Sequence, residues 1–377
     1  MPWKERSAMS LRHEFILLAV QEGTGVRALC RRFGISRKTA YKWLTRYRGE
    51  GIAGLRERSR RPRRSPRQST AAVELAVLGV RLAQPRWGGR KIRARLQAQG
   101  AEAVPAASTI TAIVRRHGGI DPAVAVQHRP WQRFEHAAPN ALWQMDFKGH
   151  FPLLSGGRCH PLTVLDDHSR FALAVQACAN EQGTTVQATL TLVFRRYGLP
   201  QRMLMDNGAP WGSDAAHPHT PLTAWLLRLG VGVSHSRPYH PQTQGKDERF
   251  HRSLNAELLT AYQWRDVASC QPRFDHWRDV YNCERPHHAL ALAVPASRYQ
   301  PSLRLFPEVL PRIEYDPSDV VRKVQMDGHI SAFGHSVLIS KAFRGLPVAL
   351  RPTAADGQWD VYFCHHRITA IDLAGSH

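Results

Sequence analysis

The 377-residue sequence predicts a multidomain fold in which an all-α N-terminal region is followed by a mixed α/β centre and an all-β C-terminal region. Three observations predict it. Apolar residues recur at helical spacing over residues 11–47 and 71–117. From residue 141, short strand-like runs alternate with helix-like runs, which is typical of a mixed α/β sheet. From residue 320, strand-like runs are separated by Asp-Gly turns.

Composition and charge limit the class of protein. The 43% hydrophobic residues suffice for several cores, and no apolar run approaches the roughly 18 residues that would span a membrane. The net charge is +22, of which +19 falls in residues 1–130, where 27 Lys+Arg face 8 Asp+Glu. This asymmetry favours a nucleic-acid partner over a generally basic protein. The six scattered cysteines form no CxxC pair, which favours a reduced, cytoplasmic protein.

Residues 1–48 predict a helix-turn-helix DNA-binding domain. Gly34 suits the tight turn between two helices, and Ser36 offers an N-cap hydroxyl for the next helix, which runs to Tyr47. That helix presents basic and aromatic side chains outward, which we expect to contact DNA: Arg37, Lys38, Tyr41 and Lys42. The alternative is a three-helix bundle with a solvated basic face.

A linker and a second helical unit follow. Residues 49–70 read as an Arg-rich linker, either a solvated tether or a segment that lies along DNA phosphates through Arg60, Arg61, Arg63 and Arg64. Residues 71–120 predict a second helix-turn-helix or winged-helix domain, with Ser108 capping its last helix. Its expected DNA contacts are Arg90, Lys91 and Arg93. Residues 121–139 are a connector, which leads into the central region.

Three carboxylates mark the central region. Asp146 lies inside an apolar strand, Asp206 ends a second strand, and Glu248 lies in the first turns of a helix predicted over about 244–262. A buried carboxylate is costly without a partner, and a hard divalent cation is such a partner. At about 100° per residue, Glu248 points away from the apolar stripe that begins at Phe250. Taken singly, Asp206 before Asn-Gly is typical of a turn and Glu248 complements the helix dipole. Taken together, in this order and beside DNA-binding units, the three acids favour a functional site.

The motifs around these acids resemble the catalytic core of bacterial insertion-sequence transposases of the DDE, or retroviral-integrase, superfamily. They are the runs 143–148 (WQMDFK), 206–208 (DNG) and 240–252 (HPQTQGKDERFHR), followed by 281–290 (YNCERPHHAL). The resemblance covers most of the chain and implies an RNase H-like core at residues 140–300. It places the acidic triad, which is both catalytic and metal-binding, on Asp146, Asp206 and Glu248. Asp247 is the alternative third acid. The pair Asp166-Asp167 reads as a turn cluster.

The resemblance also implies an activity. A DNA transposase would bind the terminal inverted repeats of an insertion sequence and would catalyse strand cleavage and strand transfer with two Mg²⁺ ions, for which Mn²⁺ can substitute. Lys246, Arg249 and Arg252 would then contact phosphates near the acids. The partners would be double-stranded DNA, as element ends and as target, and further copies of the chain in a homodimer or higher homo-oligomer. Action would be at the nucleoid, with no membrane partner.

Two other functions remain open at this point. One is a phage-type or site-directed integrase with the same core, and the other is a transposase-derived DNA-binding regulator whose core is inactive. At the C-terminal end, residues 301–319 read as a connector and residues 320–377 as a small β-barrel. Such a barrel is similar to the C-terminal barrels of integrase relatives, where it would bind DNA or join protomers; a structural cap is the alternative.

Overall fold

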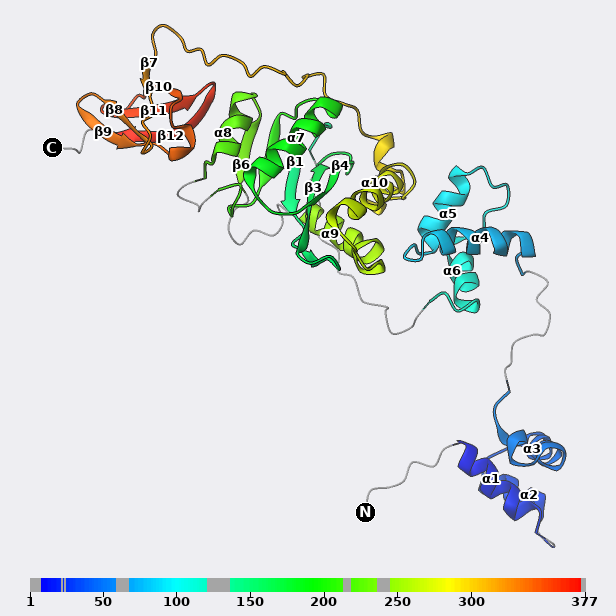
Figure 1. Ribbon diagram of the computed structural model, residues 1–377. Helices are drawn as coiled ribbons and strands as arrows, with labels where there is room; N and C mark the ends of the chain where they lie inside the picture. The colour runs from blue at the N-terminus through cyan, green and yellow to red at the C-terminus, as the bar shows by residue number, and fades with distance from the viewer. Residues whose placement is uncertain are drawn as a thin grey trace, which may run out of the picture. The chain divides into compact units, whose positions relative to one another are not determined.

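The computed structural model describes residues 8–21, 23, 25–58, 68–120, 136–212, 218–235 and 245–373, and it divides into two compact units, residues 1–68 and 69–377 (Figure 1). The first unit contains α1 (Ala8–Ala19), α2 (Val26–Arg32), α3 (Arg37–Glu50) and the 3₁₀ turn η1 (Gly51–Leu55). The predicted turn is confirmed, because Gly34 has a φ of 63°. The predicted N-cap is confirmed too: the Ser36 hydroxyl accepts a hydrogen bond from Thr39 N at 3.2 Å.

The second unit begins with three helices, α4 (Ala71–Ala83), α5 (Gly89–Ala98) and α6 (Ala107–Arg116). Residues 68–120 contain no strand, so the plain helical form of the prediction is observed and the winged form is wrong. The predicted cap at Ser108 is also wrong. Ala106 O already accepts from Ile110 N at 3.0 Å, so α6 begins one residue before Ser108. A Cβ on Gly89 would lie 2.4 Å from Ala107 O, so the contact of α5 with α6 requires glycine there.

The central region forms the expected mixed sheet. Its strands are β1 (Trp143–Phe147), β2 (Phe151–Pro152), β3 (Arg158–Asp166), β4 (Ala172–Cys178), β5 (Arg202–Met205) and β6 (Gly232–His235). β3 pairs antiparallel with β4 on one side and with β1 and β2 on the other, and β1, β5 and β6 then run parallel. The antiparallel strands precede the alternation of helix and strand along the chain, which agrees with the sequence pattern.

Helices supply two separate hydrophobic cores for this sheet. Side chains of α7 (Gly183–Tyr197) and α8 (Pro221–Arg228) join one core, and side chains of α9 (Gly245–Glu257) and α10 (Val267–Cys283) join the other. The helix predicted over 244–262 is therefore shorter, and the turn η4 (Leu259–Ala261) follows it. Two more 3₁₀ turns, η5 (His288–Leu290) and η6 (Pro295–Ser297), follow α10.

Amide side chains of α10 complete the outer edge of β4. The Asn282 amide accepts from Ala172 N at 2.8 Å and donates to Ala172 O at 2.9 Å. Near the N-terminal end of the same helix, the Gln271 amide accepts from Ala177 N at 2.8 Å and donates to Val175 O at 3.1 Å. An edge strand exposes unpaired backbone groups, so these two residues bind α10 to the sheet and also cover its edge.

The C-terminal region is sheet-rich, but the expected β-barrel is wrong: the described residues form two open sheets. Four strands pair in the order β12-β11-β10-β7 and the hairpin β8-β9 pairs only with itself, so no pairing closes the ends of the larger sheet. The strands are β7 (Val320–Lys323), β8 (His329–Ala332), β9 (His335–Leu338), β10 (Pro347–Pro352), β11 (Gln358–Phe363) and β12 (His366–Asp372), with η7 (Lys341–Phe343) between β9 and β10. Their shared core includes Ala224 and Leu227 of α8.

Within the described ranges, no helix combines the length and apolar character needed to cross a membrane.

Candidate active site and nucleic-acid surfaces

The first two predicted acids lie on neighbouring parallel strands. Asp146 belongs to β1, and Asp206 directly follows β5, two residues beyond the paired residues Gln144 and Leu204. Burial and then the negative charge of Asp206 raise the pKa of Asp146 to about 7. Two carboxylates on adjacent strands repel each other, so this arrangement favours the uptake of a proton or of a cation, either of which relieves the repulsion.

The first turn of α9 brings two adjacent acids to the same region. Asp247 is buried, whereas Glu248 is exposed, on the side of α9 away from the buried Phe250 and Leu254 as the helical geometry predicted. Burial raises the pKa of Asp247 well above its ordinary value, and the negative charges of Asp146 and Glu248 raise it further. Asp247, the alternative third acid, therefore lies close enough to Asp146 for their charges to interact.

His251, one turn further along α9, completes this cluster. Its Nε2 lies 3.5 Å from Asp247 Oδ2 and its Nδ1 lies 3.9 Å from Asp146 Oδ2. The Thr163 hydroxyl donates to Asp146 O at 3.0 Å, so in the 2.8 Å contact between His251 Nε2 and Thr163 Oγ1 the donor is the imidazole. Burial lowers the pKa of His251 to about 3, so the ring is neutral and Nδ1 carries a lone pair.

These residues fit a divalent cation. Single ligand atoms of Asp146, Asp247 and His251 all lie within 4.8 Å of one another. Asp247 Oδ1 is buried without a hydrogen-bond partner, which is costly unless a cation or a proton satisfies it. Carboxylate oxygens are the donors that Mg²⁺ and Mn²⁺ prefer. The sequence singled out Asp247 only as an alternative and did not place His251 here, although its i, i+4 spacing from Asp247 was a usable signal.

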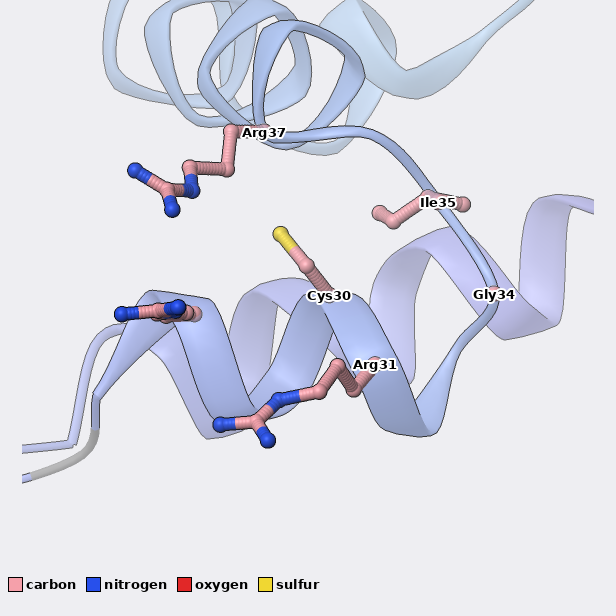
Figure 2. A pocket seen from close by; sticks show the side chains of 6 residues that line it. Cys30, Arg31, Gly34, Ile35 and Arg37 are labelled. Carbon is pink, nitrogen blue, oxygen red and sulfur yellow. The ribbon is translucent and has the colours of Figure 1, made fainter.

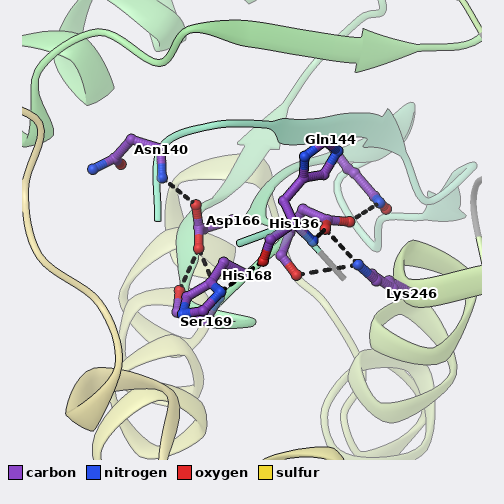
Figure 3. Close-up of polar contacts among 8 residues, drawn as sticks. His136, Asn140, Gln144, Asp166, His168, Ser169 and Lys246 are labelled. Carbon is purple, nitrogen blue, oxygen red and sulfur yellow. Dashed lines mark hydrogen bonds and ion pairs between the residues drawn. The ribbon is translucent and has the colours of Figure 1, made fainter. Parts of the chain in front are cut away.

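The end of β3 and the turn after it hold a second group of acids, which the sequence indicated to be a simple turn cluster (Figure 3). Asp166 and Asp167 are both buried. Asp166 accepts from Asn140 N at 2.8 Å and from the Ser169 backbone and hydroxyl at 2.8 and 2.6 Å. Asp167 accepts from the Gln144 amide at 2.8 Å and lies 2.5 Å from the Lys246 ammonium. The missed signal was two acids placed directly after an apolar strand.

The expected DNA contacts of the first unit are exposed on one helix. All four candidates, Arg37, Lys38, Tyr41 and Lys42, are exposed on α3. A cleft of about 390 Å³ between α2 and α3 gathers the side chains of Arg27, Arg31 and Arg37 around Cys30 (Figure 2). Arg27 and Arg31 are not among the contacts predicted from the sequence, although their i, i+4 spacing places them on one face of α2. Three guanidinium groups around one cleft suit an anion such as a DNA phosphate.

The remaining candidates differ in exposure. Arg90, Arg93, Arg249 and Arg252 are exposed, while Lys91 is half-buried and its pKa is lowered to about 7 by burial and by the charge of Arg285. Lys246, with 13% of its side chain exposed, is engaged by Asp167. The linker candidates Arg60, Arg61, Arg63 and Arg64 lie outside the described residues.

Models of known families match along the chain. A Helix-turn-helix domain matches residues 14–63 and a Homeodomain-like domain matches residues 39–114. Two models described as Integrase core domain match residues 136–241 and 229–295, and the IS481 family transposase C-terminal domain matches residues 319–377. The fold and the acids thus define a protein with N-terminal helix-turn-helix domains and a central integrase core.

Individual relatives agree with these matches. The chain is 28% identical over 159 residues to the Insertion element IS407 uncharacterized 31.7 kDa protein of Burkholderia multivorans, which is 42% of this chain and 55% of the relative. It is 27% identical over 158 residues to the Insertion element IS476 uncharacterized 39.2 kDa protein of Xanthomonas euvesicatoria, 42% of this chain and 44% of the relative. The chain thus spans about half the length of the curated relatives it matches.

Solved retroviral integrases show a weaker likeness. The HTLV-2 integrase catalytic core domain in complex with magnesium matches with a TM-score of 0.33 and 13% identity, over 44% of this chain and 99% of that one. Because this structural likeness is weak, the assignment of the chain rests on the family models and the relatives. The matched family models and the insertion-element relatives support an insertion-sequence transposase of the DDE, or retroviral-integrase, superfamily.

Proposed function

We propose that this protein binds the terminal inverted repeats of an insertion sequence and catalyses metal-dependent DNA strand cleavage and strand transfer. The observation that carries the proposal is the cluster of acids where β1, β5 and α9 meet, in which burial and mutual repulsion raise the pKa values of Asp146 and Asp247. A structural scaffold gains nothing from such a cluster, because adjacent carboxylates repel one another and lose hydration.

We assign the catalytic and metal-binding roles to Asp146, Asp206 and Glu248. Asp146 and Asp206 provide carboxylates on adjacent strands, and Glu248 is the α9 acid that stays exposed to an approaching DNA strand. Asp247 is the buried neighbour of Glu248. His251 contacts both Asp247 and Asp146, so these two residues would hold the Asp146 carboxylate in position. Two Mg²⁺ ions, or Mn²⁺ in their place, would activate the attacking oxygen and stabilise the leaving oxygen of a phosphodiester.

Recognition of DNA is assigned to the helical units and to the exposed face of α9. The α3 side chains and the arginine cleft between α2 and α3 would hold the element end, and Arg90 and Arg93 would extend the contact. Arg249 and Arg252 share the helix of Glu248, so they are suited to hold the scissile phosphate near the acids. Joining two element ends requires a homodimer or a larger homo-oligomer.

The test uses the full chain and duplexes that carry the terminal repeats flanking its own gene. We expect wild type to nick these ends with Mg²⁺ or Mn²⁺ and Glu248→Gln to abolish nicking while it leaves end binding unchanged. The matched variant Asp247→Asn, one residue away, tests the alternative third acid, and we expect it to retain measurable nicking.

Three outcomes would contradict parts of the proposal. Wild-type nicking by Glu248→Gln, together with its loss in Asp247→Asn, would move the third ligand to Asp247. Tight end binding by wild type without any nicking would favour the DNA-binding regulator with an inactive core. A gene without flanking inverted repeats, present as one copy in a prophage, would favour the phage-type integrase.

A further inference from the structure

The buried carboxylate of Asp167 contacts three segments that are distant in sequence. It accepts from the Gln144 amide at 2.8 Å and from His136 N at 3.0 Å, and it lies 2.5 Å from the Lys246 ammonium. Gln144 precedes Asp146 by two residues on β1, and Lys246 precedes Glu248 by two residues on α9. One carboxylate thus contacts two of the three elements that present acids to the site, β1 and α9.

The place of Lys246 in α9 calls for an explanation. A cation in the first turn of a helix is opposed by the helix dipole, which favours negative charge at that end. The carboxylate of Asp167 supplies that negative charge and pairs with the lysine, whose Nζ also donates to Asp167 O at 3.3 Å. The side chains of Asp167 and Lys246 are only 2% and 13% exposed, so solvent hardly screens the pair.

A second attachment lies one turn further along the same helix. His251 Nε2 donates to the Thr163 hydroxyl at 2.8 Å, and Thr163 is paired directly opposite Asp146 in the sheet. Asp247 and Glu248 therefore lie between two polar attachments, one on each side, and both lead to β3 or to the residue after it. Hydrophobic packing of Phe250 and Leu254 fixes the helix against the sheet, but polar bonds of defined length are better suited to set its position along that face.

We propose that Asp167 and Lys246 form a positioning pair that sets the separation between Asp146 on β1 and the acidic first turn of α9, and thereby the affinity of the site for a divalent cation. The catalytic consequence rests on the proposed function, whereas the effect on metal affinity does not. Lys246 acts in this account through Asp167 and not as a phosphate contact.

The experiment measures Mn²⁺ affinity of the full-length protein by electron paramagnetic resonance, together with nicking of element ends. Supporting residues around metal ligands commonly change affinity or activity by about 10–100-fold. We expect Asp167→Asn and Lys246→Met each to weaken Mn²⁺ binding by about tenfold or more. We expect kcat to fall by a similar factor while KM for DNA stays within about threefold, and Lys246→Arg to restore most of both.

Matched controls separate positioning from folding and from loss of charge. The exposed pair Arg195–Glu308 on the core surface offers Glu308→Gln, which removes an ion pair of 2.7 Å and should leave Mn²⁺ affinity unchanged. If Asp167→Asn or Lys246→Met fails to fold, Asp167→Glu keeps the charge and lengthens the link by one methylene. We then expect folded protein with about tenfold weaker Mn²⁺ binding.

Two results would overturn the proposal. The first is wild-type Mn²⁺ affinity in the folded Asp167 and Lys246 variants. The second is a Lys246→Met variant whose only defect is a raised KM for DNA with a shallower salt dependence, as a phosphate contact predicts. Wild-type protein that binds Mn²⁺ without nicking DNA would contradict the proposed function alone, because the effect of the pair on Mn²⁺ affinity could still be measured.

Discussion

Replacing Asn282 with alanine should destabilise the central core by an amount that the structure defines. The Asn282 amide makes two hydrogen bonds, and both reach Ala172 at the edge of β4. Asn282 and Ala172 are buried, so water cannot replace the lost partner. Alanine would leave one backbone N–H and one carbonyl unpaired, and each such group costs about 1–3 kcal/mol.

The expected loss in the free energy of unfolding is therefore about 2–6 kcal/mol. A shift of α10 that lets water reach the unpaired groups would bring the loss to about 2 kcal/mol. The assay is urea unfolding of the full chain, followed by far-UV circular dichroism, with the midpoint compared at constant slope. Asn255→Ala, the same substitution at an exposed position of α9, is the control and should stay within about 0.5 kcal/mol.

A decrease in the unfolding free energy of less than about 0.5 kcal/mol for Asn282→Ala would contradict this prediction. That result would mean that the edge of β4 finds other partners. Asn282 belongs to the run 281–290, which carries part of the family resemblance, so the experiment also tests whether this run serves the fold of the core more than its contact with DNA.

Three further predictions concern other parts of the chain. Arg285 pairs with Glu257 at 2.8 Å, with side chains 10% and 9% exposed, so Arg285→Ala should cost about 3–5 kcal/mol in urea unfolding; an Arg285→Ala, Glu257→Ala double variant that loses the sum of both single effects would contradict this coupling. Burial and then the charge of Arg285 lower the pKa of His287 to about 2, below its unfolded value near 6.5, so its contribution to stability is complete above pH 6.5 and is lost as the pH falls, by at most about 1.4 kcal/mol per pH unit. In His287→Phe the free energy of unfolding should therefore depend less steeply on pH below about 6.5, and an unchanged slope would show that His287 does not cause the dependence. Ser36→Ala should lower the stability of the first unit by about 1 kcal/mol in thermal unfolding, whereas Thr45→Ala within α3 should not, and equal effects would contradict the capping role.

Local signals in the sequence placed most elements close to where the structure has them. Helical spacing and the Gly34-Ser36 turn predicted α2 and α3, and the C-terminal strand-like runs correspond to β7–β12. These features depend on neighbours a few residues apart, so they can be read along the chain. The predicted closure of the C-terminal strands into a barrel was wrong. Closure depends on pairing between strands that are distant in sequence, and the residue pattern of a single strand does not indicate its partner.

Motifs, charge and short-range periodicity are properties of the chain. The sequence alone therefore indicated the resemblance to insertion-sequence transposases, the basic N-terminal third, and the acids Asp146, Asp206 and Glu248 as candidates. The folded structure was needed to show that Asp247 and His251 lie against Asp146, and that the apparent turn at Asp167 is a buried acid paired with Lys246. Burial and distance depend on how β1, β3 and α9 pack together. They determine whether a charged side chain faces solvent, a metal ion or another charge.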